Sequence, residues 1–456
     1  MIHKLKFLFT IVIAASLIKA KAQTTLIEKV EPKAGGLTIP YEKWRLANGL
    51  TVIIHEDHSD PIVNVAVTYK VGSDRESMGK SGFAHFFEHM MFQGSGHVKD
   101  EEHFKIIETA GGDMNGFTQQ DKTVYYETVP SNYVETALYL ESDRMGFLLD
   151  SLTTKKFENQ RDAVKNEKSQ NQVNQPYGMV GEYMGQTLYP MGHPYSWPVI
   201  GYVDDLEKSN LQDVKNFFMR WYGPNNAILS IAGDIDPKQV LQLTEKYFGS
   251  IKPGSEVKKI KVPPPILPAN KYFAYKDKIW LPRSERVYPT VPQYNRDEPA
   301  LYLLAAMMGG GNNSLFYKNF VKNEFAASAD VFHKSSELSG EFTIDIIAYA
   351  PDDINYEKQF NLIDEKVKAT LEEFEKTGIT DEALARAKGP LELQLTSTAS
   401  SVMNKALALA DWDRLLAPKP YNLSDELERY KKVTKEDIIR VFNRYIKGAG
   451  AAVVNV

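Results

Sequence analysis

The sequence lacks cysteine altogether. Disulfide bonds, thiolate metal sites and a cysteine nucleophile are therefore excluded. Any metal ion must be held by histidine and carboxylate side chains, a ligand set more typical of catalytic than of structural zinc. A strong charge of either sign is also lacking, because the net charge is only −5 over 456 residues. This balance gives no reason to expect nucleic acid or an anionic membrane as a partner.

The apolar run near the amino end, residues 7–18, is too short to span a bilayer, which takes about 20 residues. Two lysines precede the run and Ala20-Lys21-Ala22 follows it, which is the plan of a secretory signal peptide. We therefore expect a signal peptide over 1–22 and a mature protein that is periplasmic or extracellular and free of the membrane. A membrane anchor or an interfacial helix is the alternative.

A chain of 456 residues is too long for one ordinary core, and two domains of about 200 residues each are expected. Period-two alternation predicts strands over 50–55 and 62–71, joined as a hairpin by a turn at Asp60-Pro61. The pattern then alternates between helical segments, 81–95, 101–110, 131–150 and 155–172, and a strand-like segment, 113–130. The predicted fold class is α+β, with two related mixed domains that each contain a sheet flanked by helices.

Residues 252–270 contain five prolines, which exclude a long helix or a central strand there. We interpret this segment as a linker between an amino-terminal domain, 23–251, and a carboxy-terminal domain, 271–456.

Segments on the two sides of this linker resemble each other. Residues 213–233 and 437–456 share a helical pattern, an Arg-aromatic step, a turn and a small-apolar strand. A second match pairs 83–95 with 301–314, and it places Tyr302, Ala305 and Ala306 where the first copy has His85, Glu88 and His89. We expect two related domains, of which only the first keeps the polar triad; chance similarity is the alternative.

The triad His85, Glu88 and His89 has the spacing that puts three side chains on one face of a helix. Two histidines on one turn can hold one metal ion, and the glutamate beside them can take a proton from water; H-x-x-E-H is a known zinc-enzyme motif. A solvent-exposed helix face would show the same letters. However, phenylalanine and methionine surround the triad and predict a buried helix, in which three polar groups need partners.

A catalytic zinc ion usually takes three protein ligands, so one more is needed. The helical segment 155–172 offers two candidates, Glu158 and Glu167. Spacing alone does not choose between these carboxylates.

The chain resembles peptidases of the pitrilysin/insulinase family, in the short form of mitochondrial-processing-peptidase subunits and their bacterial relatives. The resemblance covers nearly the whole mature chain and is carried by five segments, HFFEH (85–89), 111–130, RDAVKNE (161–167), 193–201 and 221–233. It implies one Zn²⁺ per chain, held by His85, His89 and Glu167, because 77 residues separate the second histidine from Glu167. It also implies a zinc-dependent endopeptidase with Glu88 as the general base.

The same resemblance implies that Asn115, Gly116 and Phe117 lie on a sheet edge to which the peptide substrate adds as a strand. This mode of binding gives affinity through the main chain with little sequence demand. An ordinary turn at Asn115-Gly116 is the alternative.

Two departures from the family pattern affect the expected function. Gln160 stands where many members have a second glutamate, and no catalytic role is expected for it. Active members also have an Arg and a Tyr, seven apart, that bind substrate and stabilise the oxyanion, but those positions are Phe320 and Ala327 here. Since oxyanion donors contribute about 10²- to 10³-fold in rate, the resemblance implies the zinc-bearing subunit of a heterodimer, or otherwise a homodimer. A non-catalytic structural or chaperone-like subunit is the alternative function.

The remaining histidines have less specific surroundings. His97 and His103 lie in polar sequence and are expected at the surface, and His55 and His58 are expected to be solvated beside the hairpin. His193 either shapes the wall of the site or packs within a turn.

Overall fold

The computed structural model describes residues 24–32, 37–350 and 355–456, and the predicted signal peptide lies outside them. The first half of the chain forms strands β1 (Thr25–Val30), β2 (Tyr41–Arg45), β3 (Thr51–Glu56), β4 (Ile62–Tyr69), β5 (Asp113–Thr118), β6 (Thr123–Pro130) and β7 (Ala227–Gly233). Its helices are α1 (Phe83–Met90), α2 (Glu102–Thr109), α3 (Val134–Ser151), α4 (Thr154–Lys168), α5 (Val180–Leu188), α6 (Val203–Lys208), α7 (Leu211–Trp221) and α8 (Pro237–Phe248).

The second half of the chain has a smaller set of strands and longer helices. The strands are β8 (Lys271–Ala274), β9 (Arg283–Thr290), β10 (Ala326–Ser335), β11 (Gly340–Ala348) and β12 (Ala452–Asn455). The helices are α9 (Glu298–Gly309), α10 (Tyr356–Thr377), α11 (Asp381–Thr398), α12 (Val402–Leu416), α13 (Leu423–Lys431) and α14 (Lys435–Tyr445). Among the described residues, no helix is both long enough and apolar enough to cross a bilayer.

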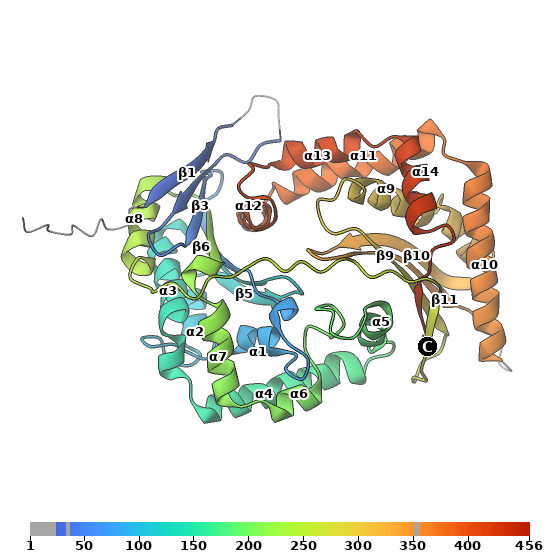
Figure 1. Ribbon diagram of the computed structural model, residues 1–456. Coiled ribbons are helices and arrows are strands. Elements are labelled where there is room, and N and C mark those ends of the chain that lie inside the picture. The colour runs from blue at the N-terminus through green and yellow to red at the C-terminus, as the bar shows by residue number, and fades with distance from the viewer. Residues whose placement is uncertain (1–23, 33–36, 351–354) are drawn as a thin grey trace, which may run out of the picture.

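Two mixed sheets organise the molecule, and the predicted α+β fold of two domains is confirmed (Figure 1). The amino-terminal sheet has the order β1-β2-β3-β7-β4-β6-β5, and the carboxy-terminal sheet has the order β10-β11-β9-β12-β8. Successive residues on the strands of the amino-terminal sheet point to opposite faces, so both faces can bury apolar side chains. On β3, Val52 and Ile54 pack into the core around α1, α3 and α7, while Ile53 packs into a second core with Leu409 of α12.

The repeat predicted from the sequence has matching helix–turn–strand units in the two sheets. Helix α7 leads into β7, and helix α14 leads into β12. Strand β7 pairs parallel to β3 and antiparallel to β4, and β12 pairs parallel to β8 and antiparallel to β9. The two strands therefore occupy equivalent places in their sheets.

Each half of the chain lends one helix to the sheet of the other half. Helix α12 packs against β3, β4 and β7 of the amino-terminal sheet, and α5 packs against β8, β9 and β12 of the carboxy-terminal sheet (Figure 1). Residues 252–270, all of which the structure describes, form neither helix nor strand. The limits 23–251 and 271–456 stay a prediction.

Three details differ from the sequence-based expectations. Strands β3 and β4 both form, but they are not a hairpin, because β7 lies between them. His55 is buried and its Nδ1 lies 2.7 Å from the carbonyl oxygen of Pro40. His103 is also buried, at 3 % exposure, with its Nε2 2.5 Å from Glu127 Oε1. Both histidines have partners that are distant in sequence, and a pattern of neighbouring residues does not reveal such partners.

Candidate metal centre

Helix α1 carries the sequence motif and is fixed at its first turn. The residue before it, Gly82, has φ +88°, and a Cβ there would lie 2.6 Å from the carbonyl oxygen of Ile200. The carboxylate of Glu76 accepts hydrogen bonds from the amides of Gly82 and Ala84, both at 2.8 Å. An acidic group at this end satisfies free amides and complements the helix dipole. The start of α1 is therefore set by tertiary contacts.

The apolar face of α1 lies in the core of the amino-terminal half. Phe83, Phe86, Phe87 and Met90 are at most 3 % exposed, and Phe87 stacks on Phe218 of α7 with a centroid distance of 5.8 Å. The three motif residues occupy the remaining face and are only partly buried. The helix is thus anchored by its phenylalanines while His85, Glu88 and His89 stay accessible.

The structure brings His85 and His89 together with Glu167 of α4. Oε2 of Glu167 lies 3.1 Å from His89 Nε2 and 3.7 Å from His85 Nε2, and one ligand atom from each of the three residues lies within 4.8 Å of the others. The second carboxylate candidate, Glu158, is exposed and lies outside this group. The geometry selects Glu167 where spacing left two possibilities.

The protonation states of this group suit a divalent cation. Burial, together with the charge of His89, lowers the pKa of His85 to about 4, so its imidazole is neutral at pH 7. Contact with the His89 ring lowers the pKa of Glu167, and a hydrogen bond from Asn171 acts in the same direction. His85 Nδ1 and Glu167 Oε2 are buried without a hydrogen-bond partner. Two imidazoles and a carboxylate are the ligands that catalytic zinc uses, with one position left open.

Glu88 lies beside this group but is not one of its converging ligands. Burial raises the pKa of Glu88, while hydrogen bonds from the hydroxyl and the amide of Thr118 oppose the rise. Thr118 is the last residue of β5. A carboxylate whose pKa is raised is a better proton acceptor.

The residues expected on a sheet edge, Asn115, Gly116 and Phe117, all lie within β5. Among the described strands, β5 is the last in its sheet and pairs with β6 alone. A Cβ at Gly116 would lie 3.1 Å from the Tyr125 ring and 3.3 Å from the Phe92 ring. The segment is therefore a packed edge strand and not the ordinary turn.

A cavity of about 790 Å³ lies between the two halves of the chain, and His85 and Glu167 are among the residues that line it. The amino-terminal half contributes His85, Glu167 and Thr118 to its lining, and the carboxy-terminal half contributes Lys334 and Arg414. The sequence singled out none of the residues from the second half, because only the folded chain brings them to this cavity. Thr118 was likewise missed, because the strand-like segment predicted over 113–130 gave no sign that a strand ends at this residue.

His193 packs behind one wall of the cavity. Its ring stacks on Tyr189 with a centroid distance of 4.5 Å, and its Nδ1 accepts a hydrogen bond from the Tyr195 amide at 3.1 Å. Both tyrosines line the cavity, so His193 supports the wall through them. Phe320 is fully buried in the carboxy-terminal core, stacked on Phe316, and Ala327 lies on β10. Neither side chain can donate a hydrogen bond.

Comparison with known proteins finds two family models on this chain. The model described as "Insulinase (Peptidase family M16)" matches residues 51–193, which include the three converging residues. The model described as "Peptidase M16 inactive domain" matches residues 208–391.

Individual relatives extend the similarity over most of the chain. The "Zinc protease PqqE" of Helicobacter pylori is 30% identical over 421 residues, which are 91% of this chain and 92% of that protein. The "Mitochondrial-processing peptidase subunit beta" of Saccharomyces cerevisiae is 26% identical over 213 residues, 46% of this chain and 45% of that protein.

Solved structures show the same architecture. A crystal structure of a protease from Helicobacter pylori has a TM-score of 0.82 and 28% identity, covering 92% of this chain and 99% of that chain. The periplasmic protease PqqL of Escherichia coli has a TM-score of 0.74 and 17% identity, covering 94% of this chain and 48% of that chain, and shows the fold alone.

Proposed function

Because the chain belongs to the insulinase family of peptidases, peptidase family M16, we propose that it is a zinc-dependent endopeptidase for peptides and small unfolded polypeptides. The observation that carries this proposal is the convergence of His85, His89 and Glu167, of which His85 and Glu167 line a cavity that both halves of the chain enclose. The three residues would hold one zinc ion per chain. The cavity restricts the substrate to chains that can enter it without a folded core.

The chemistry divides between the ion and the side chains. A zinc ion in such a ligand set lowers the pKa of water toward 7 and polarises a carbonyl group, which are the two requirements of peptide hydrolysis. The Glu88 carboxylate takes the proton of the attacking water and passes it to the leaving amine. Thr118 holds the carboxylate in place for this transfer.

The substrate strand adds to β5. An edge strand presents a row of unpaired amide and carbonyl groups, and an extended peptide can pair with them. Asn115, Gly116 and Phe117 lie on this edge, and the strand ends at the Thr118 contact with Glu88. A peptide paired there would run toward the general base.

The test of the catalytic role is the variant Glu88→Gln, with Glu158→Gln as its matched control. The first should keep one zinc ion per chain and lose about 10²- to 10⁴-fold in peptide turnover, because a general base is removed without loss of a ligand. The control lies on α4, outside the converging group, and should match the wild type. Wild-type protein without zinc by elemental analysis, or full turnover by Glu88→Gln, would refute the proposal. Zinc without turnover under any condition would favour the non-catalytic subunit.

The partner of this chain is a related subunit that lacks the triad and supplies the Arg/Tyr pair. Phe320 and Ala327 offer no donors to an oxyanion, and three relatives are named as the beta subunit, or the probable beta subunit, of mitochondrial-processing peptidase. The chain alone should therefore cleave a fluorogenic peptide weakly, and a co-purified related chain should restore turnover. If the pure chain shows full turnover and gel filtration shows that it is a monomer, the proposed need for a partner is contradicted. If it shows full turnover at twice the monomer mass, the partner is a second copy of the same chain.

The proposed place of action is outside the cytoplasm. The leader-like residues 1–22 support export, and the neighbour from Escherichia coli is described as periplasmic. Cell fractionation with N-terminal sequencing of the mature chain should find Gln23 as its first residue. A cytoplasmic chain that keeps residues 1–22 would contradict export.

A further inference from the structure

The turn between β5 and β6, residues 119–122, is held by both halves of the chain. On the amino-terminal side, the amides of Ser73 and Asp74 donate to the carbonyl oxygens of Gln119 and Gln120, at 3.3 and 2.8 Å. The turn follows Thr118 directly. Thr118 lines the same cavity as His85, and its strand β5 packs against α1, so any force that fixes the turn also fixes the end of β5 beside α1.

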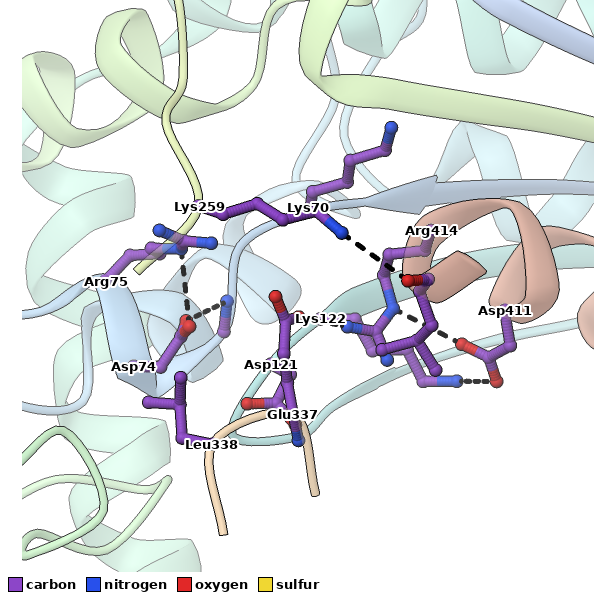
Figure 2. A network of polar contacts seen from close by, with 12 residues as sticks. Lys70, Asp74, Arg75, Asp121, Lys122, Lys259, Glu337, Leu338, Asp411 and Arg414 are labelled. Atoms are coloured by element: carbon purple, nitrogen blue, oxygen red, sulfur yellow. Dashed lines mark hydrogen bonds and ion pairs between the residues drawn. The ribbon is translucent and has the colours of Figure 1, made fainter. Parts of the chain in front are cut away.

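The carboxy-terminal half reaches this turn through the loop between β10 and β11 (Figure 2). Asp121, 7 % exposed, accepts a hydrogen bond from the Glu337 amide at 2.8 Å through Oδ2, and another from the Tyr195 hydroxyl through Oδ1. That hydroxyl in turn accepts from the Leu338 amide at 3.0 Å. The Asp121 side chain thus ties the turn to two segments at once.

A second set of contacts comes from α12, the helix that the carboxy-terminal half lends to the amino-terminal sheet. Arg414, 6 % exposed, donates to Glu337 Oε2 at 2.6 Å and lies 3.4 Å from Asp411 Oδ1. Asp411 accepts from Lys122 of the turn at 2.5 Å. The ion pairs therefore close a ring that runs from the turn to α12, to the β10–β11 loop and back to the turn (Figure 2).

Stability alone does not account for this ring. Buried ion pairs are costly to desolvate, and apolar residues of similar volume often stabilise a protein as well or better. The ring residues Asp121, Lys122, Asp411 and Arg414 line the cavity that contains His85 and Glu167. These charged contacts therefore lie at the cavity of the proposed metal centre, where the position of the β5–β6 backbone would affect peptide hydrolysis.

We propose that Asp121, Glu337 and Arg414 are positioning residues, through which the carboxy-terminal half holds the β5–β6 turn and so keeps Thr118, at the end of the substrate edge, in place beside α1, the helix that carries Glu88. This inference rests on the proposed peptidase function. It gives the second half of the chain, which lacks the metal-type triad, a specific role in the reaction. The residues act through Thr118 and touch no reacting atom.

The chain offers a matched control for this inference. Lys405 of α12 pairs with Asp57 just after β3, and this ion pair also joins the two halves of the chain. Neither residue lines the cavity as the structure describes it. Loss of this pair loosens the same helix without touching the turn.

The test compares Glu337→Gln and Arg414→Lys with Asp57→Asn in the full protein, with its partner subunit if turnover needs one. In the first two variants, amide hydrogen exchange at 119–122 should rise and kcat should fall about 10- to 100-fold, the effect of a small misplacement of a catalytic group. KM should change less than threefold and zinc content should stay the same. Asp57→Asn should show none of these changes in the turn or in kcat.

Several results would overturn the inference. Unchanged exchange at 119–122 would show that the ring does not hold the turn. Raised exchange with wild-type kcat, or an equal loss of kcat in Asp57→Asn, would leave only a structural role. These outcomes arise with an active wild type and so refute the positioning role alone. A wild type that binds no zinc and cleaves no peptide would refute the proposed function and the positioning role together.

Discussion

Removal of the Arg144 guanidinium should destabilise the protein in a way that depends on pH. Arg144 is 1 % exposed and belongs to a buried charge cluster, which we define as His103, Glu127, Glu141 and Arg144. Its Nε donates to Glu141 Oε2 at 2.8 Å, and its guanidinium lies 4.4 Å from the centroid of the Tyr125 ring. Burial lowers the pKa of His103 to about 3, so near neutral pH the charged groups are two carboxyls and one guanidinium, and ionisation of both carboxyls would leave an excess negative charge in the core.

The magnitude follows from the two carboxyl groups. Burial raises the pKa of Glu127 and that of Glu141 to about 7, although the charge of Arg144 opposes the rise in both. A carboxyl with a raised pKa lowers stability as pH rises from its unfolded pKa to its folded pKa, at about 1.4 kcal/mol per pH unit. In the wild type this loss ends near pH 7, while in Arg144→Met it continues upward because the opposing charge is gone.

The variant and the wild type should therefore diverge above pH 7. At pH 6 the cost is the lost contact of the guanidinium with the aromatic rings, about 0.5–2 kcal/mol. Between pH 7 and pH 9, each carboxyl group that stays protonated in the variant lowers its free energy of unfolding by about 3 kcal/mol relative to the wild type. A loss of this size lies within the 3–5 kcal/mol expected for a broken buried ion pair. Urea unfolding midpoints at pH 6 and pH 9 measure the difference.

The control for this measurement is Arg386→Met. Arg386 pairs with Glu382 on the exposed face of α11, and such pairs contribute about 0.3–0.5 kcal/mol. Its midpoint should follow the wild type at both pH values. An equal loss for Arg144→Met at pH 6 and pH 9 would refute the reasoning, since the carboxyl groups would then not carry the pH dependence.

Two further predictions concern the β5–β6 turn and the metal centre. Gly72→Ala should lower the unfolding midpoint and raise amide hydrogen exchange at 119–122, because its Cβ would lie 2.2 Å from the Gln119 carbonyl oxygen. The control Gly181→Ala should change neither quantity, because no atom lies within 4 Å of its Cβ. Similar effects of the two substitutions would contradict the steric cause. Zinc at 100 times its dissociation constant should stabilise the wild type by about 2.7 kcal/mol. This gain should vanish in Glu167→Gln, and the same gain in that variant would exclude Glu167 as a ligand.

The sequence predicted the elements of the candidate site better than their arrangement. Periodicity placed α1 and α4 close to their observed bounds, because this signal is local, but the single strand-like segment predicted over 113–130 is two strands, β5 and β6, joined by a turn at 119–122. Spacing alone left the choice between Glu158 and Glu167 open, since it depends on how α4 crosses α1, and only the family resemblance implied Glu167. The predicted hairpin of β3 and β4 was wrong, because a strand from 227–233 pairs between them.

The same limit applies to the residues that the second half of the chain brings to the cavity. Arg414 lies 247 positions from Glu167 along the chain (414 − 167), yet both line one cavity. Nothing in the neighbourhood of Arg414 in the sequence indicates this. The exchange of α5 and α12 between the sheets brings distant segments together, and it follows from tertiary packing alone.

The internal repeat also bears on why, among the described residues, the converging metal-type residues lie in the first half of the chain. Helix α9 corresponds to α1, and Tyr302 stands at the position of His85. There α11 and α13 contact part of the corresponding face, because the Tyr302 hydroxyl donates to Gln394 of α11 at 3.1 Å and its ring contacts Tyr430 of α13. At the Glu88 position, Ala305 is 2 % exposed, and Ala306, at the His89 position, is half-buried and lines a separate cavity. The same frame thus carries three polar side chains in the first half, while two of the three equivalent positions in the second half are alanines, which have no atom that could bind a metal ion.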